Sequence, residues 1–512
     1  MGLGYRERLS LRFVLTAVFW LGVAGIEGML MRTVLAGGLR EVYDAEHFYA
    51  MMTVHPFVGI YGWAYMAVMG AFYYLVPKVL GRGLYSERLA GLSYWLITVG
   101  VLVTWLSGFL FRFGALYTLY WPLPVVRFPP ESVLVFGLGS FMIFLAVIVF
   151  FYDMFATIFF PEDVRVTVGE VYRRLFTIAF NIDKVKAALR GSKGYVPKVF
   201  TYPVFIVGVF RGCVDTTLNA VAMAAVSLLL TVYSAARLVG AGLSPGLIDP
   251  LAYKNVFWWG LDLIADGNVL IFTAATWYFL TPLLTGRRLY GESVVRTVIL
   301  ADLVVSLFVW NHHMLADTPQ PFLLQVQGQI FTFGELITMG LTMFAVLKTI
   351  WLARPVRYTP PLAAILLSVT GFMVGGTAGL LQANYALNRY IHNTQWVIGT
   401  HAHTMLLAGL SLTLFAAIYA LAPLITGKEM DARLSYAHLL LFFVGALWMS
   451  LSMGFAGVEG MLRRTLYFNG EYAAYMYSAW VGGALMAAGY LVFIVNFLRT
   501  YGFKPILLVF RG

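Results

Sequence analysis

The sequence has little cysteine and little charge, and each scarcity excludes a class of protein. Cys213 is the only cysteine among 512 residues, which excludes intrachain disulfides, cysteine-bound zinc and cysteine-bound iron–sulfur clusters. No Cys-x-x-Cys-His sequence occurs, so the covalent attachment site of a c-type haem is absent too. Charged residues make up 12% of the chain, against about 25% in soluble proteins. So little charge cannot cover the water-facing surface of a chain this long.

Apolar residues are abundant instead, at 60% of the chain with a mean hydropathy of +0.80. Lipid must therefore be most of this protein's solvent, and we expect an all-α integral membrane fold with about twelve transmembrane helices. The expected spans are 12–36, 52–77, 90–111, 133–160, 217–240, 256–284, 293–315, 330–352, 362–386, 396–424, 436–460 and 473–498. No hydrophilic stretch is long enough for a soluble domain, so we expect one transmembrane catalytic domain over residues 1–512. The first apolar run is long and joins the rest of the pattern, and we expect no cleavable signal peptide.

The net charge is +11, and the basic residues that produce it lie in short loops between the spans. This distribution favours interpreting them as a signal of membrane topology and not as a nucleic-acid binding surface. The basic residues on one side are Arg6, Arg8, Arg12, Lys78, Arg82, Arg88, Arg287, Arg288, Arg296, Lys348, Arg354, Arg357, Lys428, Arg433, Arg499 and Lys504. The longest loop, 161–203, adds Arg165, Arg173, Arg174, Lys184, Lys186, Arg190, Lys193 and Lys198. The positive-inside rule makes this side cytoplasmic, with both termini inside, in a multi-pass protein of a prokaryotic plasma membrane.

Two arginines of an outer loop, Arg463 and Arg464, break this charge bias. They lie near the end of a short internal repeat, called the internal echo below: Gly22–Thr33 (GVAGIEGMLMRT) resembles Gly454–Thr465 (GFAGVEGMLRRT). Both segments end a span at the outer face, and quasi-equivalent helix ends on similar neighbours are one interpretation.

Ionisable groups inside a membrane are costly and are read as functional, and this applies to five histidines within expected spans: His55, His312, His313, His401 and His403. His401 and His403 are two residues apart, so on an α-helix they point about 200° apart and can face two cofactors. An imidazole nitrogen is a good axial ligand of haem iron. His55, near the outer end of the second span, lies at the right depth to supply a second axial ligand.

Neighbouring histidines and two acids indicate a second metal. His312 and His313 lie near an outer helix end, where local backbone adjustment lets both bind one ion. Asp262 and Asp266 are four residues apart in the sixth span and share a helix face. Beside two histidines, hard carboxylate ligands favour iron or manganese over copper(I). A water-lined cavity with protonated acids is the alternative.

Three motifs resemble the catalytic subunit of the haem–copper oxidase superfamily over essentially the whole chain. They are HNTQWVIGTHAH (His392–His403), WNHHMLADTPQP (Trp310–Pro321) and GMLRRT (Gly460–Thr465). The resemblance implies that His401 binds a high-spin haem and that His403 and His55 bind a low-spin haem. It gives His312 and His313 to the second metal, and Arg463 and Arg464 to the haem propionates.

The sixth span indicates the branch of that superfamily. Oxygen reductases usually carry GHPxVY there, and this chain has neither that histidine nor that tyrosine. Asp262–Phe272 (DLIADGNVLIF) is instead similar to the nitric oxide reductase pattern HLWxEGxWEL, which also follows a Trp-Trp pair, here Trp258 and Trp259. Asp262 then replaces the metal-binding histidine, and Asp266 the metal-binding glutamate. The second glutamate of the pattern is Leu270, and Met69–Lys78 (MGAFYYLVPK) also looks like the reductase segment.

The resemblance implies a respiratory nitric oxide reductase that converts two NO to N2O and water. Two haems, expected to be b-type, and a non-haem iron held by His312, His313 and Asp262 would form its redox centres, with copper as the alternative metal. Asp266 would deliver protons or complete the metal's shell. Electrons would come from a cytochrome c or cupredoxin-like subunit or from quinol, and membrane lipid is the other partner.

Other polar residues in the expected spans have weaker assignments. For Asp302 and Glu335 a proton route and interhelical hydrogen bonding are equally supported, and Glu27, Asp215 and Glu459 receive no role. His392 is a candidate support for a haem propionate. His47 and His438 are expected to be ordinary polar residues.

Three other functions stay open. An oxygen-reducing proton pump without the usual tyrosine would show copper and oxygen uptake. A nitric oxide dismutase would release oxygen. A twelve-span transporter without cofactor would be colourless when purified.

Overall fold

A computed structural model describes residues 3–160, 167–173, 202–317 and 320–510. Within these ranges every regular element is helical, which confirms the all-α expectation, and Thr394 and Leu462 form one isolated β-bridge. Ten helical stretches are long and apolar enough to cross a membrane. They are Tyr5–Leu35 (α1), Glu87–Phe111 (α4), Pro130–Phe159 (α6), Val204–Leu238 (α9), Pro250–Thr285 (α10, η4 and α11), Phe322–Leu352 (α13), Pro360–Ala383 (α14), Val397–Thr426 (η6 and α16), Ala432–Val458 (α17) and Ala473–Tyr501 (α18).

Two further expected spans are built from pieces. The second is a continuous run of α2 (Ala45–Phe57), the π-helical η1 (Val58–Tyr65) and α3 (Met66–Leu80). The seventh, predicted as 293–315, is not one helix: α12 (Glu292–Ser306) ends early, and the 3₁₀ turn η5 (Val309–Met314) follows. The short elements are α5 (Leu123–Arg127), α7 (Val168–Arg173), η3 (Pro245–Leu247), α15 (Tyr385–Ile391) and α19 (Phe503–Val509).

The fifth span begins earlier than predicted, at Val204 rather than at residue 217. The charge of Arg211 interrupts the apolar run, so a prediction from composition alone begins the span only after this residue. In the structure Arg211 is fully buried, and it forms ion pairs with Asp215 at 2.5 Å and with Asp302 at 3.2 Å. A charge paired in this way can remain inside a helix bundle.

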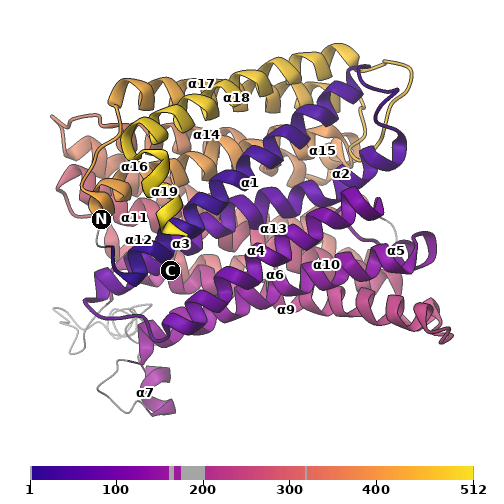
Figure 1. The fold of residues 1–512 in the computed structure, drawn as a ribbon, viewed down its shortest axis with the longest axis horizontal. Helices are drawn as coiled ribbons and strands as arrows, with labels where there is room; N and C mark the ends of the chain where they lie inside the picture. The colour runs from indigo at the N-terminus through magenta and orange to yellow at the C-terminus, as the bar shows by residue number, and fades with distance from the viewer. Residues whose placement is uncertain (1–2, 161–166, 174–201, 318–319, 511–512) are drawn as a thin grey trace.

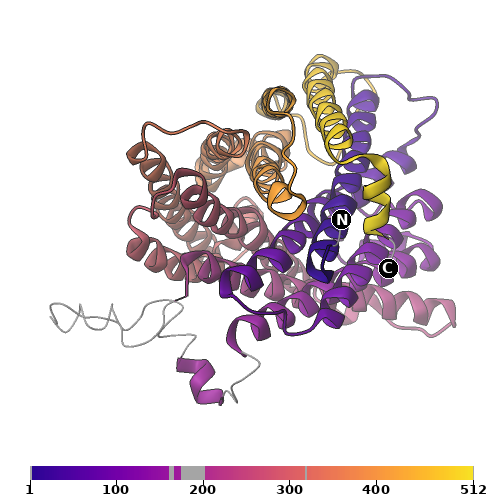
Figure 2. The same cartoon turned by 60° about the vertical axis from the view of Figure 1, so that its left-hand side comes forward.

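The long helices lie side by side in a bundle, and α18, near the end of the chain, packs beside α1 (Figures 1 and 2). Tyr490 of α18 donates a hydrogen bond to the carbonyl of Val18 in α1 at 2.9 Å. Both termini lie at the same end of the bundle (Figure 1), where Arg12 Nε donates to the Val509 carbonyl at 2.7 Å. Most of the basic loop 161–203 is outside the described residues, including Arg165, Arg174, Lys184, Lys186, Arg190, Lys193 and Lys198.

Three π-helical segments interrupt the helices that carry the candidate site residues: η1 after His55, η4 (Ala265–Ile271) at Asp266, and η6 (Val397–Ser411) at His401 and His403. α-Helical geometry was assumed for these positions, and that assumption was wrong. Each π turn holds an extra residue, and such segments occur often at functional sites. Side chains of His403 and Ser411 bond to the carbonyl five residues earlier, at 2.6 and 2.8 Å, as the wider turn allows.

Candidate metal and cofactor site

One cavity of about 560 Å³ runs between the helices and gathers the candidate site residues. Its walls come from α1, α2, η1, α10, η4, η5, α13, α14 and η6 together with the loop after α17. The lining includes His55, His401, His403, His312, His313, Asp262, Asp266, Arg463 and Arg464. These nine residues, from five separate stretches of sequence, thus face one space.

At one end of the cavity, His55 and His403 face each other. Their ring centroids are 6.3 Å apart and the ring planes differ by 20°. This is too wide for direct stacking, and it leaves room for two metal–nitrogen bonds of about 2 Å each. Gly25 and Gly59 border this end, and a methyl group on either would meet no atom within 4 Å. The space between the helices therefore suits a flat ligand held between two imidazoles.

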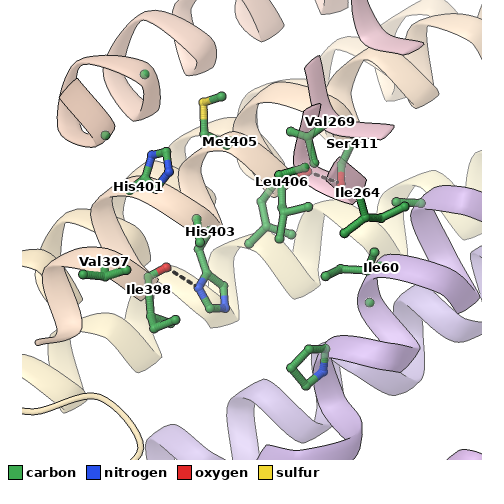
Figure 3. A pocket seen from close by; sticks show the side chains of 18 of the residues that line it. Ile60, Ile264, Val269, Val397, Ile398, His401, His403, Met405, Leu406 and Ser411 are labelled. Atoms are coloured by element: carbon green, nitrogen blue, oxygen red, sulfur yellow. Dashed lines mark hydrogen bonds between the residues drawn. The ribbon is translucent and has the colours of Figure 1, made fainter. Parts of the chain in front are cut away.

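His401 lies on the other side of η6. Figure 3 shows the His401 and His403 rings on opposite sides of the helix, so the predicted divergence persists although the helix is π rather than α. Gly379 of α14 packs directly against His401, and a Cβ there would lie 2.6 Å from the imidazole Cε1. Close packing of this kind fixes the ring's orientation.

Hydrogen bonds select the tautomer of three histidines. The Nδ1 atoms of His401, His403 and His312 lie 2.9, 2.6 and 3.1 Å from the backbone carbonyls of Gly375, Ile398 and Val309. A carbonyl only accepts, so each Nδ1 donates and each Nε2 keeps its lone pair. This is the arrangement that a metal-binding histidine needs.

His312, His313 and Asp262 form a compact cluster whose ligand atoms lie within 4.8 Å of one another. The Nε2 atoms of His313 and His312 are 2.9 and 4.0 Å from Asp262 Oδ1. Both separations are below twice a metal–ligand bond of about 2.0–2.2 Å, so one ion can bind all three groups. The 3₁₀ turn of η5 brings the consecutive imidazoles together, with centroids 4.1 Å apart. Two histidines and one carboxylate are the donor set typical of non-haem Fe(II).

An aromatic stack supports the cluster from the outer side. The indole of Trp258 lies nearly parallel to the His313 ring, at 4.5 Å between centroids and 24° between planes. The Arg463 guanidinium carbon lies over the same indole, 5.7 Å from its centroid. The stack links the loop after α17 to the metal cluster.

A second pair of carboxyl groups lies beside the cluster. Asp266 of η4 and Glu335 of α13 both line the cavity, and their carboxyl groups are close enough to interact electrostatically. Asp266 Oδ2 and Asp262 Oδ2 are buried without a hydrogen-bond partner among the described residues. Unpaired buried oxygens of this kind are rare and indicate a missing cation or proton.

The arginine pair also lacks an anion. Arg463 and Arg464 share one neutral acceptor, Asn393 Oδ1, at 2.8 and 2.7 Å. No described carboxylate forms a salt bridge with either arginine, although Arg463 is only 5% exposed. Arg32 lines the same cavity, and within the described residues its side chain donates one hydrogen bond, to Met476 Sδ at 3.4 Å. Three arginines without a described carboxylate partner, all lining one cavity, fit the acidic groups of a haem.

His392 makes a different contact from the expected propionate. Its Nε2 lies 3.1 Å from Asp317 Oδ1, and Lys254 Nζ lies 2.5 Å from Asp317 Oδ2. Burial alone would raise the pKa of the Asp317 carboxyl, but these two hydrogen bonds and the Lys254 charge bring its pKa below the usual value. The three residues join α10 to the segment after η5 and to the end of α15.

For Asp302 the structure shows the hydrogen-bonding alternative. Its carboxylate receives Arg211 at 3.2 Å and the Thr338 hydroxyl at 2.5 Å, which ties α12 to α9 and α13. Asp215 is the second ion-pair partner of Arg211. Among the remaining histidines, His438 is fully buried and bonds to the Tyr419 hydroxyl at 2.8 Å.

Sequence reasoning missed the roles of Glu27 and Arg32, both on α1. Glu27 is 2% exposed, and its Oε2 lies 3.3 Å from His55 Nδ1. The signal was present in the internal echo, which repeats both residues near the outer end of a span: Glu27 matches Glu459 and Arg32 matches Arg464.

Comparison with known proteins agrees with this geometry. Residues 8–486 match the family model described as cytochrome c and quinol oxidase polypeptide I. The chain is similar to cytochrome c oxidase subunit 1 of Thermostichus vulcanus, at 25% identity over 96% of this chain and 83% of the relative. It is also similar to quinol oxidase subunit 1 of Bacillus subtilis, at 23% identity over 97% of this chain and 72% of the relative.

A solved structure shares the fold. It is described as a heme-copper terminal oxidase dimer, and it matches with a TM-score of 0.77 and 20% identity, covering 97% of this chain and 84% of that one.

Proposed function

The chain belongs to the haem–copper oxidase subunit I family, and within that family we propose that it is a nitric oxide reductase. The family consists of membrane-bound oxidoreductases that bind haems and a copper or iron centre. The proposed reaction is 2 NO + 2 e⁻ + 2 H⁺ → N2O + H2O. We further propose that the chain works as one transmembrane domain over residues 1–512, with both termini cytoplasmic.

The observation that carries the proposal is the carboxylate of Asp262 beside His312 and His313. An aspartate in this place gives the two-histidine, one-carboxylate donor set of non-haem iron, and it adds negative charge that stabilises ferric iron over ferrous. The described cavity lining contains a single tyrosine, Tyr117, which lies on the loop between α4 and α5 with its ring centroid 5.9 Å from the Arg464 guanidinium, and not on the α10–η4 stretch that carries Asp262. A tyrosine that donates an electron and a proton is what the resemblance leads one to expect of an oxygen reductase.

Each residue then has a proposed role. His55 and His403 would hold a low-spin haem, His401 a high-spin haem, and Arg463 and Arg464 the acidic groups of these haems. When bound, the haems and the iron would supply electron transfer and the binding of NO.

The protein's own acids handle protons. Asp262 would bind the metal as a carboxylate, whereas Asp266 and Glu335 line the same cavity, and Asp266 Oδ2 has no hydrogen-bond partner among the described residues. Neighbouring carboxyl groups in a water-poor cavity can hold one proton between them and release it toward the reacting gas. The two protons of the reaction would reach the site through this pair.

Oxygen reduction is the second candidate. The relatives that we compare carry oxidase names, and the family uses O2 with electron donors such as cytochrome c or quinol. Under this alternative the same three ligands would hold copper. The family membership removes the support for a transporter without cofactor.

Gas analysis of the purified protein tests the proposal. With a chemical electron donor and no oxygen, we expect one N2O for every two NO consumed and no oxygen release. With oxygen as the sole acceptor, we expect little uptake. Rapid oxygen uptake without N2O formation would establish the oxidase instead, and oxygen release from NO would indicate a dismutase.

A further inference from the structure

Glu27 is a buried carboxylate at the junction of three helices. It lies on α1, and at 2% exposure its side chain is screened from lipid and water. Oε2 lies 3.3 Å from Nδ1 of His55 on α2, and Oε1 accepts a 2.9 Å hydrogen bond from the Trp105 indole on α4. An isolated ionised carboxylate would be costly here, so its place needs a reason.

The contact to His55 differs from those of the other histidines around the cavity. His401, His403 and His312 donate from Nδ1 to neutral backbone carbonyls. His55 alone among these four donates to a carboxylate. The donor atom is Nδ1, so the lone pair of the other ring nitrogen, Nε2, stays available in a residue that lines the cavity.

A carboxylate behind a metal-binding histidine changes the metal. It draws the Nδ1 proton toward itself, which raises the electron density and basicity of Nε2. A more basic axial ligand stabilises the ferric state of a haem more than the ferrous state, and hydrogen bonding around axial ligands is one of the means by which proteins tune haem potential.

We propose that Glu27 is a positioning residue that orients His55 and lowers the reduction potential of the haem held between His55 and His403. The inference rests on the haem site of the proposed function, and it holds whichever gas the enzyme reduces. Trp105 takes part by sharing the negative charge of Glu27 through its indole hydrogen bond.

The internal echo supplies a matched control. Glu459 occupies the equivalent position of the second copy, Gly454–Thr465, but it is exposed, and its carboxylate forms no hydrogen bond or ion pair with the described residues. A Glu→Gln substitution at each position makes the same chemical change in nearly the same local sequence. Only the one at Glu27 removes a charge next to a histidine.

The test is a redox titration of the purified haem protein, followed by the optical bands of the low-spin haem. Glu27→Gln should shift its midpoint potential upward, whereas Glu459→Gln should leave it in place. Trp105→Phe should shift it downward, because Glu27 then keeps more charge for His55. The spread of g values in the ferric low-spin EPR spectrum should change in the same two directions.

Opposite shifts distinguish electrostatic tuning from a merely structural role, which would move both variants the same way. An unchanged potential in a Glu27→Gln protein that retains its low-spin haem would overturn the inference while leaving the proposed function intact. If the Gln variant loses this haem, the direction of the Trp105→Phe shift decides. A wild-type protein without a low-spin haem would overturn the haem site and this inference together.

Discussion

The two ends of the cavity use carboxylates in different ways. At the His55–His403 end, the single carboxylate, Glu27, lies behind a histidine and outside the cavity lining. At the His401 end, three carboxyl groups face the cavity itself: Asp262, Asp266 and Glu335. One end therefore presents imidazoles to a ligand without carboxyl groups in the described cavity lining, and the other presents imidazoles together with acidic oxygens.

This difference separates electron transfer from chemistry. A site that only passes electrons needs two fixed axial ligands and a tuned potential, and protons near it serve no purpose. A site that reduces a gas needs an open metal position and a proton supply, which the extra carboxyl groups provide. Substitutions can break or sharpen this division, and the expected effects differ in size.

Removing Asp262 should have the largest effect. In Asp262→Ala, the two histidines alone should hold the non-haem metal on the order of 100-fold or more weakly, because losing even an outer partner of a ligand costs about 10–100-fold. Activity should be lost while both haems remain. Metal analysis and haem spectra measure these outcomes.

Asp262→His is the matched variant for that experiment. It restores a third donor and should retain a metal, with copper now competing with iron. Unchanged metal content in the Ala variant would contradict a ligand role for Asp262.

Glu335→Gln should come next. It keeps the shape of the side chain but removes the shared proton, and we expect turnover to fall by roughly 10²-fold, the usual worth of a proton-transfer group. Metal content should stay constant, since Glu335 is not one of the three clustered ligands. Steady-state rates with a solvent isotope effect test this, with the exposed Glu459→Gln as control. A loss of iron in Glu335→Gln would instead make Glu335 a ligand.

A smaller effect is expected from Gly379→Ala. The added methyl would lie 2.6 Å from His401 Cε1, so the ring must shift. Forcing a methyl into a filled site costs about 1–3 kcal/mol, which should weaken binding of the His401 haem and spare the His55–His403 haem. Haem content and spectra distinguish the two haems. Leu381→Ala, at an exposed position of the same helix, is the control, and equal loss of both haems would contradict the separation of the two ends.

The smallest expected effect is the pH-dependent contribution of Asp317 to the stability of the fold. The folded-state pKa of Asp317 lies below the unfolded value of about 3.9, so its ion pair stabilises the fold above roughly pH 4, and this contribution is lost as the pH falls through the lowered pKa. Asp317→Asn should lower the melting temperature slightly at neutral pH. The gap between variant and wild type should close on acidification, and a gap that stays constant with pH would contradict this assignment.

Local sequence patterns were enough to predict much of the candidate site. The two-residue spacing of His401 and His403 requires opposite directions on an α-helix, and the outcome is the same on the observed π-helix. Arg463 and Arg464 were recognisable because they break the charge bias of the outer loops. The helical class and most spans followed from apolar runs of membrane length.

The remaining features depend on distant parts of the chain. The bond from Glu27 to His55 joins two helices, and the burial of Arg211 depends on Asp302, which lies 91 residues away. Such pairs leave no local signature, so the span over Arg211 was shortened and Glu27 received no role. The π-helical segments were missed for a related reason: they change the backbone hydrogen bonds and not the composition.

The most direct test of the central claim is the identity and ligation of the non-haem metal in the purified protein. We expect about two haems and one further iron per chain, without copper, and an iron X-ray absorption spectrum that fits mixed nitrogen and oxygen ligands. Loss of the oxygen component in Asp262→His would assign it to the carboxylate. Copper in place of the third iron, with a ligand shell of nitrogen alone, would contradict the account.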